Sequence, residues 1–310
     1  MRQTDNATAT LLMVGAMAAF AVEDLFLKRA AMALPPGQVI AMMGAGGALV
    51  FWALAAMKRQ PILTRRALQG APLIRALSEA AATMLYITAL ALIPLSINSA
   101  LLQASPLVVT MGAALFLGEK VGWRRWTAIG VGFLGVLIVL QPWNDGFQAA
   151  GILTVLCVIV LASRDLATRA MPEDIGTFQL VTWAYLALIP AGLILMALGG
   201  DGPAAIDPTR SFDLVMALIS GLFGYYAVTA ATRMGEAAVI APFRYTRLVF
   251  ALILAMLVLG ERPGPAMLIG AALIIGSGLY TFTRERMRAR AGSAALTLIS
   301  PRRRDFPCRF

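Results

Sequence analysis

Long apolar runs, separated by short polar or basic segments, follow one another over residues 8–283 of the chain. Each run has about 20 residues, the length that an α-helix needs to cross a hydrocarbon core about 30 Å thick. The predicted spans are residues 8–27, 38–57, 72–93, 96–117, 124–141, 149–168, 177–198, 212–232, 236–259 and 265–283. The weakest boundary is the third, where only Pro94 and Leu95 interrupt the apolar pattern. The pattern therefore predicts an all-α membrane protein with ten transmembrane helices.

Composition excludes several classes of protein. Of the 310 residues 59% are hydrophobic and 14% are charged, against about 25% charged in a soluble domain. The chain has no histidine, and its two cysteines, Cys157 and Cys308, make neither a disulfide framework nor a metal-ligand set. It also lacks the glycine-lysine motif of a phosphate-binding loop. We therefore expect no catalytic residues, no metal and no cofactor.

The basic residues predict the orientation in the membrane. If the N-terminus is inside, the inner segments hold eighteen lysines and arginines and the outer segments hold four. By the positive-inside rule both termini are then cytoplasmic. The net charge of +10 does not indicate nucleic-acid binding, because the basic residues lie between and after the apolar runs. The arginine-rich tail, residues 284–310, is expected to be disordered, as a topology anchor or a contact for anionic lipid.

The second half of the sequence resembles the first. Matching residues recur at offsets of 140 to 142: Leu117-Gly118-Glu119-Lys120 and Leu259-Gly260-Glu261-Arg262, Tyr86 and Tyr226, Asp24 with Lys28 and Asp165 with Arg169, Ile129-Gly130 and Ile269-Gly270. This periodicity predicts two five-span repeats, residues 1–141 and 142–283. Because five is an odd number, the second repeat must enter the membrane from the opposite side. Such inverted repeats are common in secondary transporters. The two repeated Leu-Gly-Glu turns are expected to cap helix ends.

These features together resemble the EamA family of the drug/metabolite transporter superfamily. The resemblance covers residues 8–283 and rests on a tyrosine-containing span, a proline in a small-residue span (Pro106 and Pro242), the Leu-Gly-Glu-Lys/Arg turn and a glycine-patterned last span. It implies ten helices, a bacterial inner membrane and movement of small metabolites. Together with the inverted repeats, it favours a secondary active transporter that works by alternating access. Relatives are associated with amino acids, sugars, nucleotide-like compounds, S-adenosylmethionine and riboflavin. An intramembrane enzyme and a passive channel are the alternatives.

Two arginines are predicted near the middle of the ninth span. Arg244 and Arg247 are three residues apart, so a helix would place them on one face. Arginine stays protonated and offers donors that suit a carboxylate or a phosphate, whereas an ionised side chain at mid-bilayer costs about 2.5–3.5 kcal/mol even on the lenient insertion scale. We expect this pair either to bind an anionic substrate or to be neutralised by carboxylates such as Glu79 or Asp24.

Other charged residues suggest gates and coupling. Arg75 and Glu79 are four residues apart in the third span and are expected to form a structural salt bridge. Asp24 and Asp165 occupy equivalent positions in the two repeats, which suggests paired gates, although terminal anchoring explains them equally well. If a proton rather than a counter-substrate is the coupling species, Glu79 is the best single candidate. Burial of this carboxylate and an arginine partner would act on it in opposite directions.

Aromatic and amide residues near the middle of the spans indicate a ligand with a flat apolar part. The candidates for substrate binding are Tyr86, Tyr225, Tyr226, Trp183 and Gln103, together with the two arginines. Aromatic rings with a polar group suit a cavity that needs both stacking and a hydrogen bond, but packing between helices is an alternative for each. We expect an anionic or zwitterionic small molecule (amino-acid-like, nucleotide-like or flavin-like) as substrate, the lipid bilayer as surroundings, and a monomer or weak homodimer.

Overall fold

The computed structural model describes residues 5–62, 64–116, 118, 122–143, 149–169, 171, 175–200 and 202–299, and over them the chain is helical without a strand. The first half contains α1 (Asn6–Ala31), α2 (Pro36–Met57), η1 (Arg65–Leu68), α3 (Gly70–Leu92), α4 (Leu95–Leu102), α5 (Ser105–Phe116) and α6 (Trp123–Leu140). The second half contains α7 (Gly151–Arg169), α8 (Thr177–Gly199), α9 (Pro208–Met234), α10 (Ala237–Ile240), η2 (Ala241–Tyr245), α11 (Thr246–Val258) and α12 (Pro265–Ile299).

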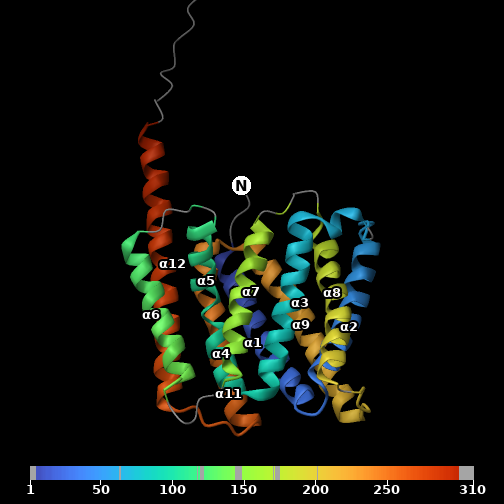
Figure 1. The fold of residues 1–310 in the computed structure, drawn as a ribbon. Helices are drawn as coiled ribbons and strands as arrows, with labels where there is room; N and C mark the ends of the chain where they lie inside the picture. Colours follow the sequence, from blue (N-terminus) through green and yellow to red (C-terminus); the bar gives the residue numbers. More distant parts are fainter. Residues whose placement is uncertain are drawn as a thin grey trace, which may run out of the picture.

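Within the part of the chain that the structure describes, ten segments are long and apolar enough to cross a membrane, as predicted. The first begins at Asn6 and the last reaches Arg284. Past that point α12 continues to Ile299, so the segment expected to be disordered from residue 284 begins with a helix. Arginine, methionine and alanine all have high helix propensity, which accounts for the extension. Figure 1 shows the chain entering the bundle at the end where α12 leaves it; we call this the terminal end, and the other the opposite end.

Spans four and nine are not continuous helices. Span four is broken between α4 and α5 at Gln103 and Ala104, and span nine changes from α10 to the 3-10 turn η2 and then to α11. Pro106 and Pro242 follow or lie in these breaks, because proline has no N–H to continue a helical ladder. The Gln103 amide donates a hydrogen bond to the carbonyl of Tyr245 at 3.2 Å. The two breaks therefore meet inside the bundle.

The contacts between helices follow the pattern that two repeats related by a twofold axis would give. The contact of α1 with α9 has an equivalent in the contact of α7 with α3. The contact of α1 with α11 likewise has an equivalent in the contact of α7 with α5. The axis would pass between the two members of three further contacting pairs, which are α2–α8, α6–α12 and α4–α11. Figure 1 places α6 beside α12 at one edge of the bundle and α2 beside α8 at the other. This arrangement agrees with the predicted inverted repeats, whose boundaries remain a prediction.

Glycine allows the edge helices to approach closely. A β-carbon on Gly135 of α6 would lie 2.7 Å from the carbonyl oxygen of Gly270 of α12, well inside van der Waals contact. Gly37 of α2 and Gly192 of α8 make the same kind of backbone contact. Small residues have this role in membrane bundles, where packing replaces the hydrophobic effect between helices.

At the opposite end of the bundle, charged side chains form hydrogen bonds with the terminal backbone groups of neighbouring helices. Lys28 Nζ donates to the carbonyl oxygens of Leu90 at 2.7 Å and Ile93 at 2.8 Å, where α3 ends. The carboxylate of Glu261 accepts hydrogen bonds from the N–H groups of Leu95 at 2.6 Å and Ser96 at 3.0 Å, where α4 begins. The capping role predicted for Glu261 is confirmed. Its counterpart Glu119 lies outside the described residues, as do Leu117 and Lys120.

Candidate functional site

Side chains from three helices meet at Asp24 of α1. The Tyr86 hydroxyl of α3 donates to Asp24 Oδ1 at 2.6 Å, and Arg247 of α11 donates to both carboxylate oxygens, from Nη2 at 2.8 Å and from Nε at 3.0 Å. The Asp24 side chain is 1% exposed, whereas that of Arg247 is 22% exposed. We call these three residues the Asp24 cluster. The Asp24 carboxylate is enclosed by protein donors, and part of the Arg247 guanidinium side chain stays exposed.

This cluster lies deep within the spans. Asp24 is about 10 Å along α1 from Ala31, and Arg247 is about 16 Å along α11 from Val258, at 1.5 Å per residue. Removing two charges from water costs several kcal/mol per ion, so a buried pair needs good geometry. The two N–H donors that Arg247 directs at one carboxylate provide it. The expectation that Asp24 neutralises an arginine of span nine is therefore confirmed for Arg247.

A second group of charges lies nearer the terminal end, between α3 and α7. Arg164 Nη1 lies 3.3 Å from Glu79 Oε1, and Arg164 Nη2 lies 2.7 Å from Asp165 Oδ1. Side-chain exposures of 27% for Arg164, 24% for Glu79 and 37% for Asp165 show that these groups are only partly covered. We call these residues the Glu79 cluster.

The expected salt bridge between Arg75 and Glu79 is wrong. The i to i+4 spacing on α3 permits it, but Arg164 of the facing helix takes the carboxylate of Glu79 instead. Arg75 turns to the same helix, where its Nε donates to Thr168 Oγ1 at 3.1 Å. Both side chains of α3 thus find partners on α7, which packs along it. The contact across the bundle prevails over the local pair.

Aromatic side chains gather beside these charges. Phe51 of α2 stacks on Tyr185 of α8 with ring centroids 5.5 Å apart, and it meets the ring of Tyr225 of α9 edge-on at 5.5 Å. Both tyrosines are within electrostatic reach of Glu79. On the other side, the guanidinium of Arg247 lies 5.2 Å from the ring centroid of Phe20. The interior therefore combines flat rings with charged groups.

Three of the predicted binding residues point elsewhere. Arg244 lies in η2 and is exposed, so it does not share the partner of Arg247. Tyr226 is 69% exposed on the outer side of α9, whereas its neighbour Tyr225 faces Phe51. The amide of Gln103 is used in the contact with Tyr245 described above. Of the predicted set, the structure brings together Arg247, Tyr86 and Asp24, and separately Glu79 and Asp165.

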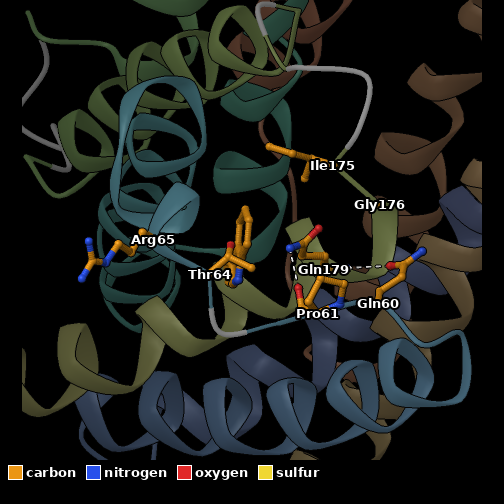
Figure 2. Close-up of a pocket in the computed structure, with 8 residues that line it drawn as sticks. Gln60, Pro61, Thr64, Arg65, Ile175, Gly176 and Gln179 are labelled. Atoms are coloured by element: carbon orange, nitrogen blue, oxygen red, sulfur yellow. Dashed lines mark hydrogen bonds between the residues drawn. The ribbon is translucent and has the colours of Figure 1, made fainter.

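Trp183 lies at a different pocket, at the terminal end between α8 and the segment that joins α2 to α3. Its indole N–H donates to the carbonyl of Ile62 at 2.6 Å. The pocket has a volume of about 370 Å³ and is lined by Gln60, Pro61, Thr64, Arg65, Ile175, Gly176, Gln179 and Trp183. Figure 2 shows Gln179 directed at Pro61 and Gln60, while the Arg65 guanidinium extends away from them. The tryptophan thus holds a connection in place on the α8 side of the bundle.

Sequence reasoning missed Phe51 as the ring that contacts Tyr185 and Tyr225, and Phe20 as the ring beside Arg247. Nothing in an apolar run distinguishes a ring that faces the interior from one that faces lipid. Arg164 carried a usable signal. It is the neighbour of Asp165, whose repeat counterpart is Asp24. An arginine inside an apolar span requires a partner or a wet surface, and Glu79 is that partner.

The sequence profile of the EamA-like transporter family matches residues 7–141 and 148–283. The chain belongs to this family. A riboflavin transporter of Rhizobium johnstonii is 32% identical over 206 residues, which are 66% of this chain and 67% of the relative. The pseudopaline exporter CntI of Pseudomonas aeruginosa is 27% identical over 272 residues, covering 86% of this chain and 93% of the relative. The predicted family membership is confirmed.

A solved crystal structure has the same fold as this EamA-family chain. It superposes with a TM-score of 0.60 at 18% sequence identity, covering 93% of this chain and 99% of the other. The family and its named relatives are transporters, so the chain is a multi-pass membrane protein that transports a small metabolite. An intramembrane enzyme, the alternative considered from the sequence, is not supported.

Proposed function

We propose that this EamA-family protein is a secondary active transporter of a flavin-like compound, a flat heteroaromatic metabolite with polar substituents, and that it works by alternating access. The single observation that carries the proposal is the partial exposure of paired charges deep in the spans: 22% for Arg247, 27% for Arg164 and 24% for Glu79. Charged side chains in hydrocarbon must face a partner or water. Each of these groups has both a partner and remaining open surface, as the lining of a wet central cavity requires.

The aromatic side chains support a flat substrate. Phe51, Tyr185 and Tyr225 come from three helices and present rings beside the charge of Glu79. An isoalloxazine ring system can stack on such side chains, and its polar substituents can bond to the charged groups. The identity with a riboflavin transporter over two thirds of the chain agrees with this chemistry. We therefore take riboflavin as the first ligand to test.

The two charge clusters suggest how the halves open alternately. Asp24 and Arg247 join α1 of the first repeat to α11 of the second, nearer the opposite end. Glu79 and Arg164 join α3 to α7, nearer the terminal end. Rocking of the two repeats about the meeting point of the broken spans would loosen one cluster while the other stays closed. We propose these clusters as the two gates.

We place the terminal end in the cytoplasm of a bacterium, with the bundle in the inner membrane. The support is the charge distribution: the connection from α2 to α3 and the end of α12, both at the terminal end, are rich in lysine and arginine. We propose a monomer or a weak homodimer as the transporting unit, since one chain carries both segments that match the family, residues 7–141 and 148–283.

Two adjacent tyrosines provide the test. Riboflavin is fluorescent, so its binding to purified protein is measured by fluorescence titration. Tyr225→Ala removes a ring that meets Phe51, and Tyr226→Ala removes one that is 69% exposed. Stacking on an aromatic side chain contributes about 1–3 kcal/mol, so we expect about a fivefold to hundredfold loss of affinity for Tyr225→Ala and no change for Tyr226→Ala.

The titration also identifies failure of the proposal. If the wild-type protein does not bind riboflavin, a flavin-like substrate is wrong. If both tyrosine variants lose affinity equally, the binding site does not lie among the rings of α2, α8 and α9. Circular dichroism of each variant checks that the helices are intact.

A further inference from the structure

Glu23 is an acidic side chain in the middle of the bundle that belongs to neither charge cluster. It precedes Asp24 on α1 and is partly buried. Its carboxylate lies against Gly221 of α9, where a β-carbon would collide with Glu23 Oε1. Gly221 is the central residue of α9, thirteen positions from either end. The carboxylate is therefore near mid-membrane, at the interface between the two repeats.

The charged and titratable groups around Glu23 come from several helices. Asp24 is on its own helix, Glu79 on α3, Tyr185 on α8 and Arg247 on α11, while α9 contributes the backbone at Gly221. Among these described groups Arg247 is the basic one, and its Nε and Nη2 are already bonded to Asp24. Glu23 itself forms no ion pair with any basic side chain that the structure describes.

The repeat relation explains why Glu23 is unpaired. The offset of 141 that relates Asp24 to Asp165 also relates Glu23 to Arg164. Arg164 finds Glu79 on the facing helix. At the offset of 140, the counterpart of Glu79 on α9 is Ile219, which is 54% exposed and apolar. The second charge pair that symmetry would give is therefore absent at this interface, and one carboxylate remains.

We propose that Glu23 carries the proton that drives transport, taking it up from one side of the membrane and releasing it on the other. This inference rests on the proposed secondary active mechanism. The Glu23 carboxylate binds one proton to become a neutral acid and loses the same proton later, so each cycle moves one proton and regenerates the protein.

The position against α9 links this proton to the conformational change. A charged, unpaired Glu23 carboxylate that packs against the α9 backbone inside the membrane has a high free energy. The protonated, neutral acid can be buried between α1 and α9 at a lower cost. The proton therefore favours the arrangement in which α1 and α9 close around Glu23. Loss of the proton favours the arrangement in which water reaches it.

Glu79, the carboxylate that the sequence favoured for coupling, has a different environment. Its Oε1 lies 3.3 Å from Arg164 Nη1, so it already has a permanent counter-charge. A proton placed on Glu79 would break that pair. Glu79→Gln is therefore an internal control for Glu23→Gln, and Glu236→Gln, at an exposed position between α9 and α10, is the neutral control.

The first test needs no substrate. Infrared difference spectra of the protein in lipid vesicles, recorded on a pH step across neutrality, detect carboxyl groups that gain a proton through their C=O stretching band. We expect one such band in the wild-type protein, Glu79→Gln and Glu236→Gln, and its loss in Glu23→Gln. If Glu23→Gln fails to fold, Glu23→Asp should keep the band at a shifted frequency. A band that persists in Glu23→Gln, is unshifted in Glu23→Asp or is absent from the wild-type protein would overturn the proposal.

The second test separates coupling from binding. In proteoliposomes, Glu23→Gln should exchange riboflavin across the membrane in counterflow as the wild type does, but should lose accumulation driven by a pH gradient. Normal accumulation in this variant, or loss of counterflow as well, would refute a coupling role. If wild-type vesicles show no riboflavin counterflow, the proposed substrate is wrong, and the infrared result still decides whether Glu23 binds the proton.

Discussion

Removing Arg247 should destabilise the protein more than removing Asp24, although the two side chains form one ion pair. In Arg247→Met, the Asp24 carboxylate, which is 1% exposed, keeps only the Tyr86 hydroxyl as a donor. In Asp24→Asn, the Arg247 side chain is 22% exposed and still lies over the Phe20 ring at 5.2 Å, so water and the ring replace part of what is lost.

The expected difference is measurable. Leaving a buried charge without its partner costs about 3–5 kcal/mol, the value we expect for Arg247→Met. A partly exposed guanidinium that loses a hydrogen-bonded partner should cost about 1–2 kcal/mol, the value we expect for Asp24→Asn. At roughly 2 °C per kcal/mol for a large domain, the midpoint temperature of thermal unfolding in detergent should fall by about 6–10 °C for Arg247→Met and by about 2–4 °C for Asp24→Asn.

The double variant completes the measurement. Asp24→Asn with Arg247→Met has no buried unpaired charge, so it should be more stable than Arg247→Met alone, with a coupling free energy of at least about 1 kcal/mol. Equal losses in the two single variants, or strict additivity in the double variant, would refute the idea that burial of the carboxylate determines the cost. All three variants should lose transport if the pair is a gate.

Two further predictions concern the scaffold. Gly135→Ala should lower the free energy of unfolding by about 1–3 kcal/mol, because the new methyl group would be pushed onto the Gly270 carbonyl. Gly130→Ala on the same helix has nothing within 4 Å of the added carbon, so it should raise the free energy of unfolding by up to about 1 kcal/mol through helix propensity. Thermal unfolding distinguishes the two variants, and equal effects would argue against the close contact. Trp183→Phe should lower the free energy of unfolding by about 1–3 kcal/mol, because the Ile62 carbonyl loses its 2.6 Å donor. Trypsin should then cut the basic connection after α2 faster than in the wild-type protein. An unchanged cleavage rate would count against a role of Trp183 in holding this connection.

The ten spans could be predicted from the sequence because the bilayer imposes a length and a polarity on each helix. The cap at Glu261 also followed from its place in a turn. The partners of the charges could not be predicted in the same way. Glu79 selects Arg164 across the bundle instead of Arg75 four residues away, since only the packed structure says which helix faces α3.

The direction of aromatic side chains was also beyond the sequence. Tyr225 and Tyr226 are adjacent in an apolar helix, and both fitted a cavity. Neighbouring residues point about 100° apart on a helix, so one of the two could face inward, and nothing in the local pattern selects it. The structure turns Tyr225 to Phe51 and leaves Tyr226 69% exposed. The same ambiguity affected Trp183, whose indole bonds to a connecting segment.

Partial exposure decides whether the paired charges can act as gates. In the proposed mechanism, rocking of one repeat against the other separates Arg247 from Asp24 or Arg164 from Glu79, because each pair would join the two repeats. If both members were fully buried, each separation would cost about 3–5 kcal/mol without compensation. The arginines are 22% and 27% exposed, so water can begin to replace the carboxylate before the contact is lost. Asp24, at 1% exposure, has no such access. The Tyr86 hydroxyl donates to it at 2.6 Å, and we expect this hydrogen bond to lower the free-energy cost of opening the proposed gate.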